Sequence, residues 1–312
     1  MYKFLRLVQN ENMKLFRKTS TLIMILMLIG AIITVGAITK YNGLQEDTDW
    51  RQNVKSETVA LKQQLSHTHG NAAKALKKQI AVNEYRLAHN IPPLSNRSIW
   101  GFTNNATDMM LIITIFTIII AGGIVSGEFH SGTIKLLLTK PVSRSTVLLS
   151  KYVTVLFAGL SFSALSLIGS WLTGGVLFGF TDLDHPALTV LGGKVVEENM
   201  LVHVLAVYGL DFVQLIVMAT IAFMISSAFR NTSLAIGLTI FAMMGGQLVL
   251  QLLARYDWVK YVLFANLDLS GFFGTGQPPV EGLTLGFSIT VLLVYYAVFI
   301  AIGWVAFTRR DV

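Results

Sequence analysis

Long apolar runs dominate this chain. Six stretches of about twenty residues carry almost no charge, and only the fourth is interrupted by an acid, Asp211. A helix rises ~1.5 Å per residue, so about 20 apolar residues cross a hydrocarbon core of roughly 30 Å. The pattern therefore predicts an all-α membrane protein with six transmembrane helices. The predicted spans are residues 20–40, 107–127, 150–180, 203–229, 232–253 and 283–308.

The basic residues between the spans predict the orientation of the chain. They gather in the N-terminal segment 1–19, in the loop 128–149, at Arg230 and in the tail 309–312. Loops on the cytoplasmic side of a membrane carry an excess of lysine and arginine. With six spans these four regions lie on the same side, so we predict that both termini are cytoplasmic.

The long first loop, residues 41–106, is expected outside the cell. It is rich in charge, but a loop of this length is translocated largely regardless of its charge. Apolar residues recur at helical spacing over 46–90, and His67–Asn71 supplies turn residues in the middle. Pro92 ends the second arm. We predict an extracellular helical hairpin in this loop.

Three other segments complete the predicted outer surface. After the hairpin, a polar stretch returns to the membrane with Trp100 and Phe102 as interface anchors. The third loop, residues 181–202, is acidic, and the fifth, residues 254–282, is close to neutral. In the fifth loop an apolar stretch too short to cross precedes several glycines and prolines. We predict a re-entrant or interfacial pair of short helices there, with a plain extracellular loop as the alternative.

Two features of the predicted helices bear on packing. Residues 1–19 alternate apolar and basic clusters, which favours an amphipathic helix in the cytoplasmic interface over a merely solvated basic flank. The third span contains Gly169, Gly174, Gly175 and Gly179. Glycines in lipid permit close helix approach or local unwinding.

Composition narrows the function. Of the 312 residues 53% are hydrophobic and only 13% are charged, and the net charge of +7 is explained by topology before nucleic-acid binding. No cysteine is present, which excludes disulfides, thiolate metal sites and a cysteine nucleophile. The chain lacks a phosphate-binding Gly-x-x-x-x-Gly-Lys-Ser/Thr loop, a His-Glu-x-x-His zinc motif and a Gly-x-Ser-x-Gly nucleophile motif. We therefore expect no enzymatic activity, no cofactor and no nucleic-acid partner for this chain.

Few polar groups are candidates for a metal or substrate site. His67 and His69 lie in the hairpin turn, and the group from Asp182 to His185 lies in an acidic loop, so we expect both to be solvated and not metal ligands. Asp211 and Gln214 are three residues apart and share a face of the fourth span. A carboxylate within a span is costly and faces a bundle interior or a water-filled cavity. The pair is a candidate substrate pathway, with a structural hydrogen bond as the alternative.

The segment Gly127–Arg144 carries a resemblance to a known family. It reads Gly-Glu-Phe-His-Ser-Gly-Thr-Ile-Lys-Leu-Leu-Leu-Thr-Lys-Pro-Val-Ser-Arg. It resembles the cytoplasmic loop of ABC-2 type permeases, in which an acid ends the second span, Gly-Thr follows, and a Pro-Val-Ser-Arg-like turn precedes the third span. These are membrane subunits of ATP-binding-cassette exporters. With six spans, cytoplasmic termini and a long first extracellular loop, the resemblance extends over nearly the whole chain, to permeases of bacterial antibiotic-peptide and sodium export.

The resemblance implies a fold and partners. It implies the ABC-2 permease fold in a bacterial cell membrane, a second permease chain of the same or a different kind, and two ABC ATPase subunits that carry ATP and magnesium. Residues 127–150 would hold the coupling helix, which docks on the ATPase. The residues that the resemblance assigns to coupling are Glu128, Gly132, Thr133, Ile134, Lys135, Lys140, Pro141 and Arg144.

This interpretation predicts a permease without catalytic groups that is driven by a partner ATPase. It exports a substrate such as a peptide antibiotic or another amphiphile, and the long first loop leaves the substrate class open. Glu128 is expected to anchor the coupling segment by pairing with Lys135, Arg144 or a basic residue of the N-terminal segment. The main alternative is a membrane sensor or scaffold with the hairpin as a receptor and no ATPase partner. A secondary transporter would need internal repeats, and an intramembrane enzyme would need paired acids or a metal motif.

Overall fold

The computed structural model describes residues 2–42, 49–133, 142–274, 276, 278–280 and 282–309. In these ranges six helical segments are long and apolar enough to cross a membrane, as the hydropathy pattern predicts. They are α2 (Thr19–Asn42), the column α5 to α7 (Ile99–His130), α9 (Arg144–Phe178), α10 (Met200–Phe229), α11 (Thr232–Leu253) and α12 (Leu285–Arg309).

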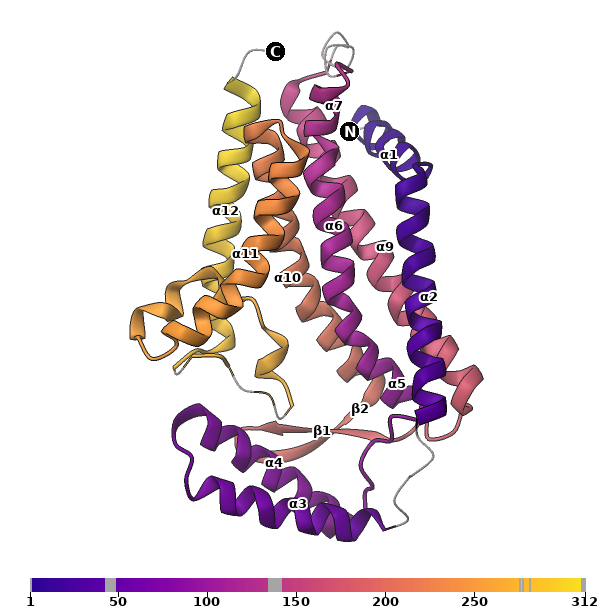
Figure 1. Ribbon diagram of the computed structural model, residues 1–312, viewed down its shortest axis with the longest axis vertical. Coiled ribbons are helices and arrows are strands. Elements are labelled where there is room, and N and C mark those ends of the chain that lie inside the picture. Colours follow the sequence, from indigo (N-terminus) through magenta and orange to yellow (C-terminus); the bar gives the residue numbers. More distant parts are fainter. Residues whose placement is uncertain are drawn as a thin grey trace.

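The helices form a bundle organised around α10. This helix packs against α6, α9, α11 and α12, whereas α2 packs mainly on α9. Both termini lie at one end of the bundle, near α7 and α1 (Tyr2–Phe16), and the helices α3 and α4 lie across the opposite end (Figure 1). An even number of crossings requires the termini to share an end.

The second column is longer and more buried than expected. It consists of α5 (Ile99–Asn105), the 3₁₀ turn η1 (Ala106–Met109), α6 (Met110–Ile124) and α7 (Ser126–His130). The prediction that Trp100 and Phe102 sit in a polar return as interface anchors is wrong, because their side chains are only 6% and 2% exposed. Gly174 of α9 explains the burial of α5: a Cβ at this position would lie 3.3 Å from the Ile99 backbone.

The first loop contains the predicted helical hairpin, with α3 (Trp50–Leu65) packed against α4 (Gly70–His89). Asp49 caps α3 by accepting a hydrogen bond of 3.2 Å from the Gln52 amide. At the other end, Asn90 adopts the left-handed conformation that terminates α4. The turn between the arms, residues 66–69, falls within two residues of its predicted limits.

The third loop contains a sheet that the sequence analysis did not predict. Strands β1 (Pro186–Leu191) and β2 (Lys194–Asn199) pair antiparallel. Gly192 and Gly193 join them with φ values of +57° and +81°, the conformation that a tight two-residue hairpin turn requires. The sheet lies between α4 and the end of the bundle (Figure 1).

The fifth loop contains three 3₁₀ turns where a pair of short helices was expected. They are η2 (Asp257–Tyr261), η3 (Leu263–Asn266) and η4 (Ser270–Phe272). Turns η2 and η3 contact each other, and η3 packs on α11 and α12.

Candidate functional site

A break in the second column determines where Glu128 lies. Helix α6 ends at Ile124 and α7 begins at Ser126. Ser226 of α10 donates a hydrogen bond of 2.7 Å to the Gly122 carbonyl and accepts one of 3.1 Å from the Ser126 amide. A helix can break inside a bundle where hydroxyls of neighbouring helices bind the backbone groups that the break releases. Helix α7 is therefore a separate turn, and its Glu128 is buried.

We expect Ser226→Ala to lower the free energy of unfolding by about 1–3 kcal/mol, since it leaves the Ser126 amide without its buried acceptor. Thermal unfolding of the purified protein in detergent measures the effect. Ser161→Ala is the matched control, because Ser161 is exposed and bonds only the Phe157 carbonyl of its own helix. Equal losses in both variants would contradict a role for Ser226 at the break.

Four charged side chains meet beside α7. Lys14 of α1 donates a hydrogen bond of 2.7 Å to Oε1 of Glu128, and Nζ of Lys151 of α9 forms an ion pair of 2.8 Å with the same oxygen. Lys151 also pairs with Oε2 of Glu11 from α1, at 2.8 Å. We call these four residues the charge quartet. It holds two cations and two anions and joins three helices that are distant in sequence.

Burial makes Lys151 the centre of the charge quartet. Its side chain is 1% exposed, whereas that of Lys14 is 51% exposed. A lysine is almost never fully buried unless it is paired, because removing its charge from water costs several kcal/mol. Two carboxylates, from Glu11 and Glu128, compensate Lys151 directly. The N-terminal helix is thus fixed to α9 and α7 by a dry ionic contact.

Lys14 remains charged in this setting. Burial disfavours its charged form, but the hydrogen bond to Glu128 and the charges of Glu128 and Glu11 outweigh that effect and raise the pKa of Lys14 above its ordinary value of 10.5. A raised pKa in the folded state contributes stability below pH 10.5 that is lost as the pH rises through the folded value. The contact between Lys14 and Glu128 therefore persists at neutral pH.

A cavity of about 270 Å³ adjoins the charge quartet. Lys14, Lys18, Ser131 and Thr133 line it together with Glu128. Oε2 of Glu128 is buried there and has no hydrogen-bond partner among the described residues. Thr133, the last residue described before α9 and its cap, thus lies at the edge of this cavity.

Aromatic contacts tie α7 to the other half of the bundle. The guanidinium of Arg230, at the end of α10, lies 4.2 Å from the ring centroid of Phe129. The rings of Phe129 and Phe307 of α12 meet edge to face, with centroids 6.2 Å apart. With the charge quartet, these contacts connect one short helix to α1, α9, α10 and α12.

The structure places half of the predicted coupling residues. Glu128 lies in α7, Gly132 ends that helix with a φ of +70°, and the Thr133 hydroxyl lies 2.9 Å from that of Ser131. Arg144 is the first residue of α9, and Ser143 caps this helix by accepting a hydrogen bond from the Thr146 amide. The remaining candidates, Ile134, Lys135, Lys140 and Pro141, lie outside the described residues.

The partner of Glu128 was predicted only in part. The expected basic residue of the N-terminal segment is Lys14. Lys151, which the sequence analysis did not single out, is the more buried partner. The sequence contained one signal for this partner: Lys151 lies eight residues into a helix that continues as an apolar span. Such a charge needs a partner, and Glu128 lies at the facing end of the preceding span.

Asp211 and Gln214 lie on α10, far from the charge quartet in sequence, and both are half-buried. Ser270 of η4 and the carboxylates of Asp268 and Asp108 are among the groups that act on Asp211 electrostatically. The structure therefore sets Asp211 near the fifth loop. Its role in a substrate pathway remains a prediction.

The described residues contain no group of three or more histidine or acidic side chains that could hold a metal ion. His185 instead links two loops, since its ring nitrogens lie 3.1 and 3.0 Å from the carbonyls of Pro92 and Pro186.

Comparisons with known proteins place the chain in a family. Residues 70–312 match the family described as "Protein of unknown function (DUF2705)". The "Uncharacterized protein YhcI" of Bacillus subtilis (strain 168) is 35% identical over 313 residues, which cover 99% of each chain. The "Uncharacterized membrane protein YdbK" of the same organism is 30% identical over 214 residues, covering 68% of this chain and 82% of the relative. The chain is a multi-span membrane protein that belongs to the DUF2705 family.

Proposed function

We propose that this chain is the permease subunit of an ABC-2 type exporter, which moves an amphiphilic substrate such as a peptide out of the cell with ATP hydrolysed on a separate subunit. The observation that carries the proposal is the convergence of α1, α9, α10 and α12 on α7. Helix α7 contains the first residues of the segment that resembles the coupling loop of these permeases.

This arrangement suits the transmission of force. A push on the segment after Thr133 reaches α7 first, and the ion pairs of Glu128 carry it to α1 and α9. Phe129 carries it to α10 and α12 through its ring contacts. Rigid-body rotation of helices around a substrate path is an established form of alternating access.

Co-purification tests the proposal directly. The tagged chain is extracted from its native membranes in mild detergent, and the associated subunits are identified by mass spectrometry. We expect a nucleotide-binding ATPase in about equal amount to the permease. A preparation that consistently lacks any ATPase would contradict the proposal.

Labelling of single cysteines tests the orientation on which that proposal depends. The chain has no cysteine of its own, so Lys140→Cys and Ser66→Cys each create a single reactive site. In intact cells a membrane-impermeant maleimide should label Ser66→Cys, in the exposed hairpin turn, and should spare Lys140→Cys. Labelling of Lys140→Cys before permeabilisation would place the coupling segment on the wrong side.

A second candidate function is a membrane sensor with the α3–α4 hairpin as its receptor. The observation that favours it is a cavity of about 390 Å³ between the hairpin and the bundle. The co-purification experiment separates the two functions, because a sensor requires no ATPase partner.

A further inference from the structure

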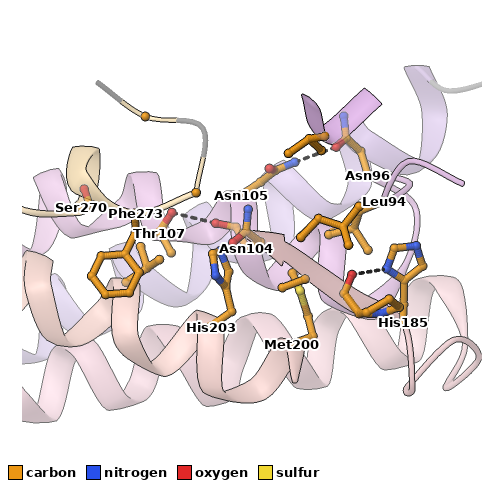
Figure 2. Close-up of a pocket in the computed structure, with 18 of the residues that line it drawn as sticks. Leu94, Asn96, Asn104, Asn105, Thr107, His185, Met200, His203, Ser270 and Phe273 are labelled. Carbon is orange, nitrogen blue, oxygen red and sulfur yellow. Dashed lines mark hydrogen bonds between the residues drawn. The ribbon is translucent and has the colours of Figure 1, made fainter. Parts of the chain in front are cut away.

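A cavity lies at the end of the bundle opposite the termini. Its volume of about 390 Å³ falls in the range of small-molecule sites. Its walls come from α4, α5, β1, α10 and the region of η4, as Figure 2 shows in part. The elements that surround it are thus distant in sequence.

Helix α4 forms the outer wall of this cavity and is anchored on two sides. Lys78 donates a hydrogen bond of 3.2 Å to the Gly276 carbonyl in the fifth loop. The Tyr85 hydroxyl donates a hydrogen bond of 3.0 Å to Oε1 of Glu197 in β2. Between these anchors, Val82 and Arg86 line the cavity. The α3–α4 hairpin therefore covers the outer side of the cavity.

Arg86 carries a charge that the protein does not pair. Its Nε is buried without a hydrogen-bond partner, and it forms no ion pair within the described part of the chain. Burial lowers the pKa of Arg86 from its ordinary value, and the charge of Glu57 opposes that shift only in part. Arg86 as a whole is half-buried, and a guanidinium that is partly removed from water costs free energy unless something compensates it.

The facing wall holds a second unsatisfied nitrogen. Nδ1 of His203, on α10, is buried and has no hydrogen-bond partner among the residues described. Figure 2 shows His203 and Asn104 in the middle of the cavity, with the apolar side chains of Phe273 and Met200 on either side. The cavity thus combines polar groups at its centre with apolar surface around them.

We propose that this cavity binds a small, partly apolar molecule whose anionic group, a carboxylate or a phosphate, pairs with Arg86. The planar guanidinium matches both groups geometrically, because two parallel N–H donors can face two oxygens. No carboxylate is among the described lining residues: Glu57, Glu198 and Asp211 act on the neighbouring groups without lining the cavity. His203 and Asn104 contact the polar part of the ligand, and Phe273 and Met200 contact its apolar part.

The site is independent of the exporter proposal. It would serve a permease as an extracellular substrate or regulator site, and it would serve a sensor as the receptor site. A failure of ATPase co-purification therefore leaves it unaffected, and a failure of ligand binding leaves the exporter proposal unaffected.

Calorimetry on the full chain in lipid nanodiscs tests the site. The probes are an N-acetylated dipeptide with a free terminal carboxylate, the same dipeptide as its terminal amide, and inorganic phosphate. We expect saturable binding of the free dipeptide or of phosphate, with the amide at least ~10-fold weaker than the free dipeptide. Whether the dipeptide or phosphate binds more tightly identifies the source of the anionic group. Absence of binding by both anionic probes would overturn the proposal.

Variants of α4 assign the binding to Arg86. Arg86→Gln should weaken binding at least ~10-fold, whereas Lys77→Gln, which removes an exposed charge from the same helix, should leave it within about twofold. Arg86→Met should raise the melting temperature of the ligand-free protein, because an apolar side chain replaces an unpaired cation that is partly removed from water. A lower melting temperature, or unchanged binding by Arg86→Gln, would mean that Arg86 supports the fold and not a ligand.

Discussion

Lys151→Met is expected to lower the free energy of unfolding by about 3–5 kcal/mol, the largest loss from any single change in the charge quartet. The substitution keeps the length of the side chain but leaves Glu11 and Glu128 close together with only Lys14 to compensate them. Removing one partner from a buried ionic contact leaves an uncompensated charge in a poorly solvated site. We expect α1 to detach from α9 in this variant.

Unfolding in detergent, followed by circular dichroism, measures the loss. Lys14→Met is the matched control: Lys14 is half-exposed, so its removal should cost no more than about 1 kcal/mol. Adding Glu11→Gln to Lys151→Met should restore part of the stability, because one of the two stranded carboxylates disappears. Similar losses for Lys14→Met and Lys151→Met would refute the central place of Lys151.

We expect Glu128→Gln to uncouple ATP hydrolysis from export, so that less substrate is exported for each ATP hydrolysed. Glutamine preserves the shape of the side chain, and Lys151 keeps Glu11 as a counter-ion, so the fold and the complex should survive. The charge-assisted contacts that join α7 to α1 and α9 become weaker, and such contacts are about twice as strong as neutral ones. We therefore expect export per ATP hydrolysed to fall at least ~10-fold, a loss of about 1.4 kcal/mol in coupling.

Proteoliposomes that contain the permease with its co-purified ATPase measure hydrolysis and export of the co-purified substrate together. Glu84→Gln is the control, because the pair of Glu84 with Lys62 is exposed and lies on the hairpin at the far end of the molecule. Wild-type export by Glu128→Gln would rule out the anchoring role. A variant that no longer assembles would show that Glu128 acts on the fold instead.

Hydropathy and capping residues predicted much of the fold because they act locally. The six apolar helices follow from the length of the apolar runs, and the α3–α4 hairpin follows from helical spacing with a turn between its arms. Ser143 caps α9 in the same local way, accepting a hydrogen bond of 3.2 Å from the Thr146 amide. These features depend on a few neighbouring residues and not on the rest of the fold.

Features that depend on distant contacts could not be predicted. The sequence predicts that Trp100 is an interface anchor, yet its indole nitrogen donates a hydrogen bond of 2.9 Å to the Leu183 carbonyl. Helix α5 packs into a space that Gly174 leaves open. The β1–β2 hairpin is short and packs against α4. Glu128 was identified, but its partner Lys151 becomes evident only when the second and third spans are placed side by side.

The charge quartet also bears on the order in which contacts form while the chain is synthesised. Its members come from positions 11, 14, 128 and 151, so all four lie in the first half of the chain. Glu11 leaves the ribosome 140 residues before the lysine that it binds. Lys14 of the N-terminal helix obtains its partner Glu128 with the second span, whereas Glu11 obtains its partner Lys151 only with the third, before α10 has been synthesised. A chain truncated before residue 151 would lack Lys151. Its basic N-terminal helix would then be held less firmly at the membrane surface and would be accessible to quality-control proteases.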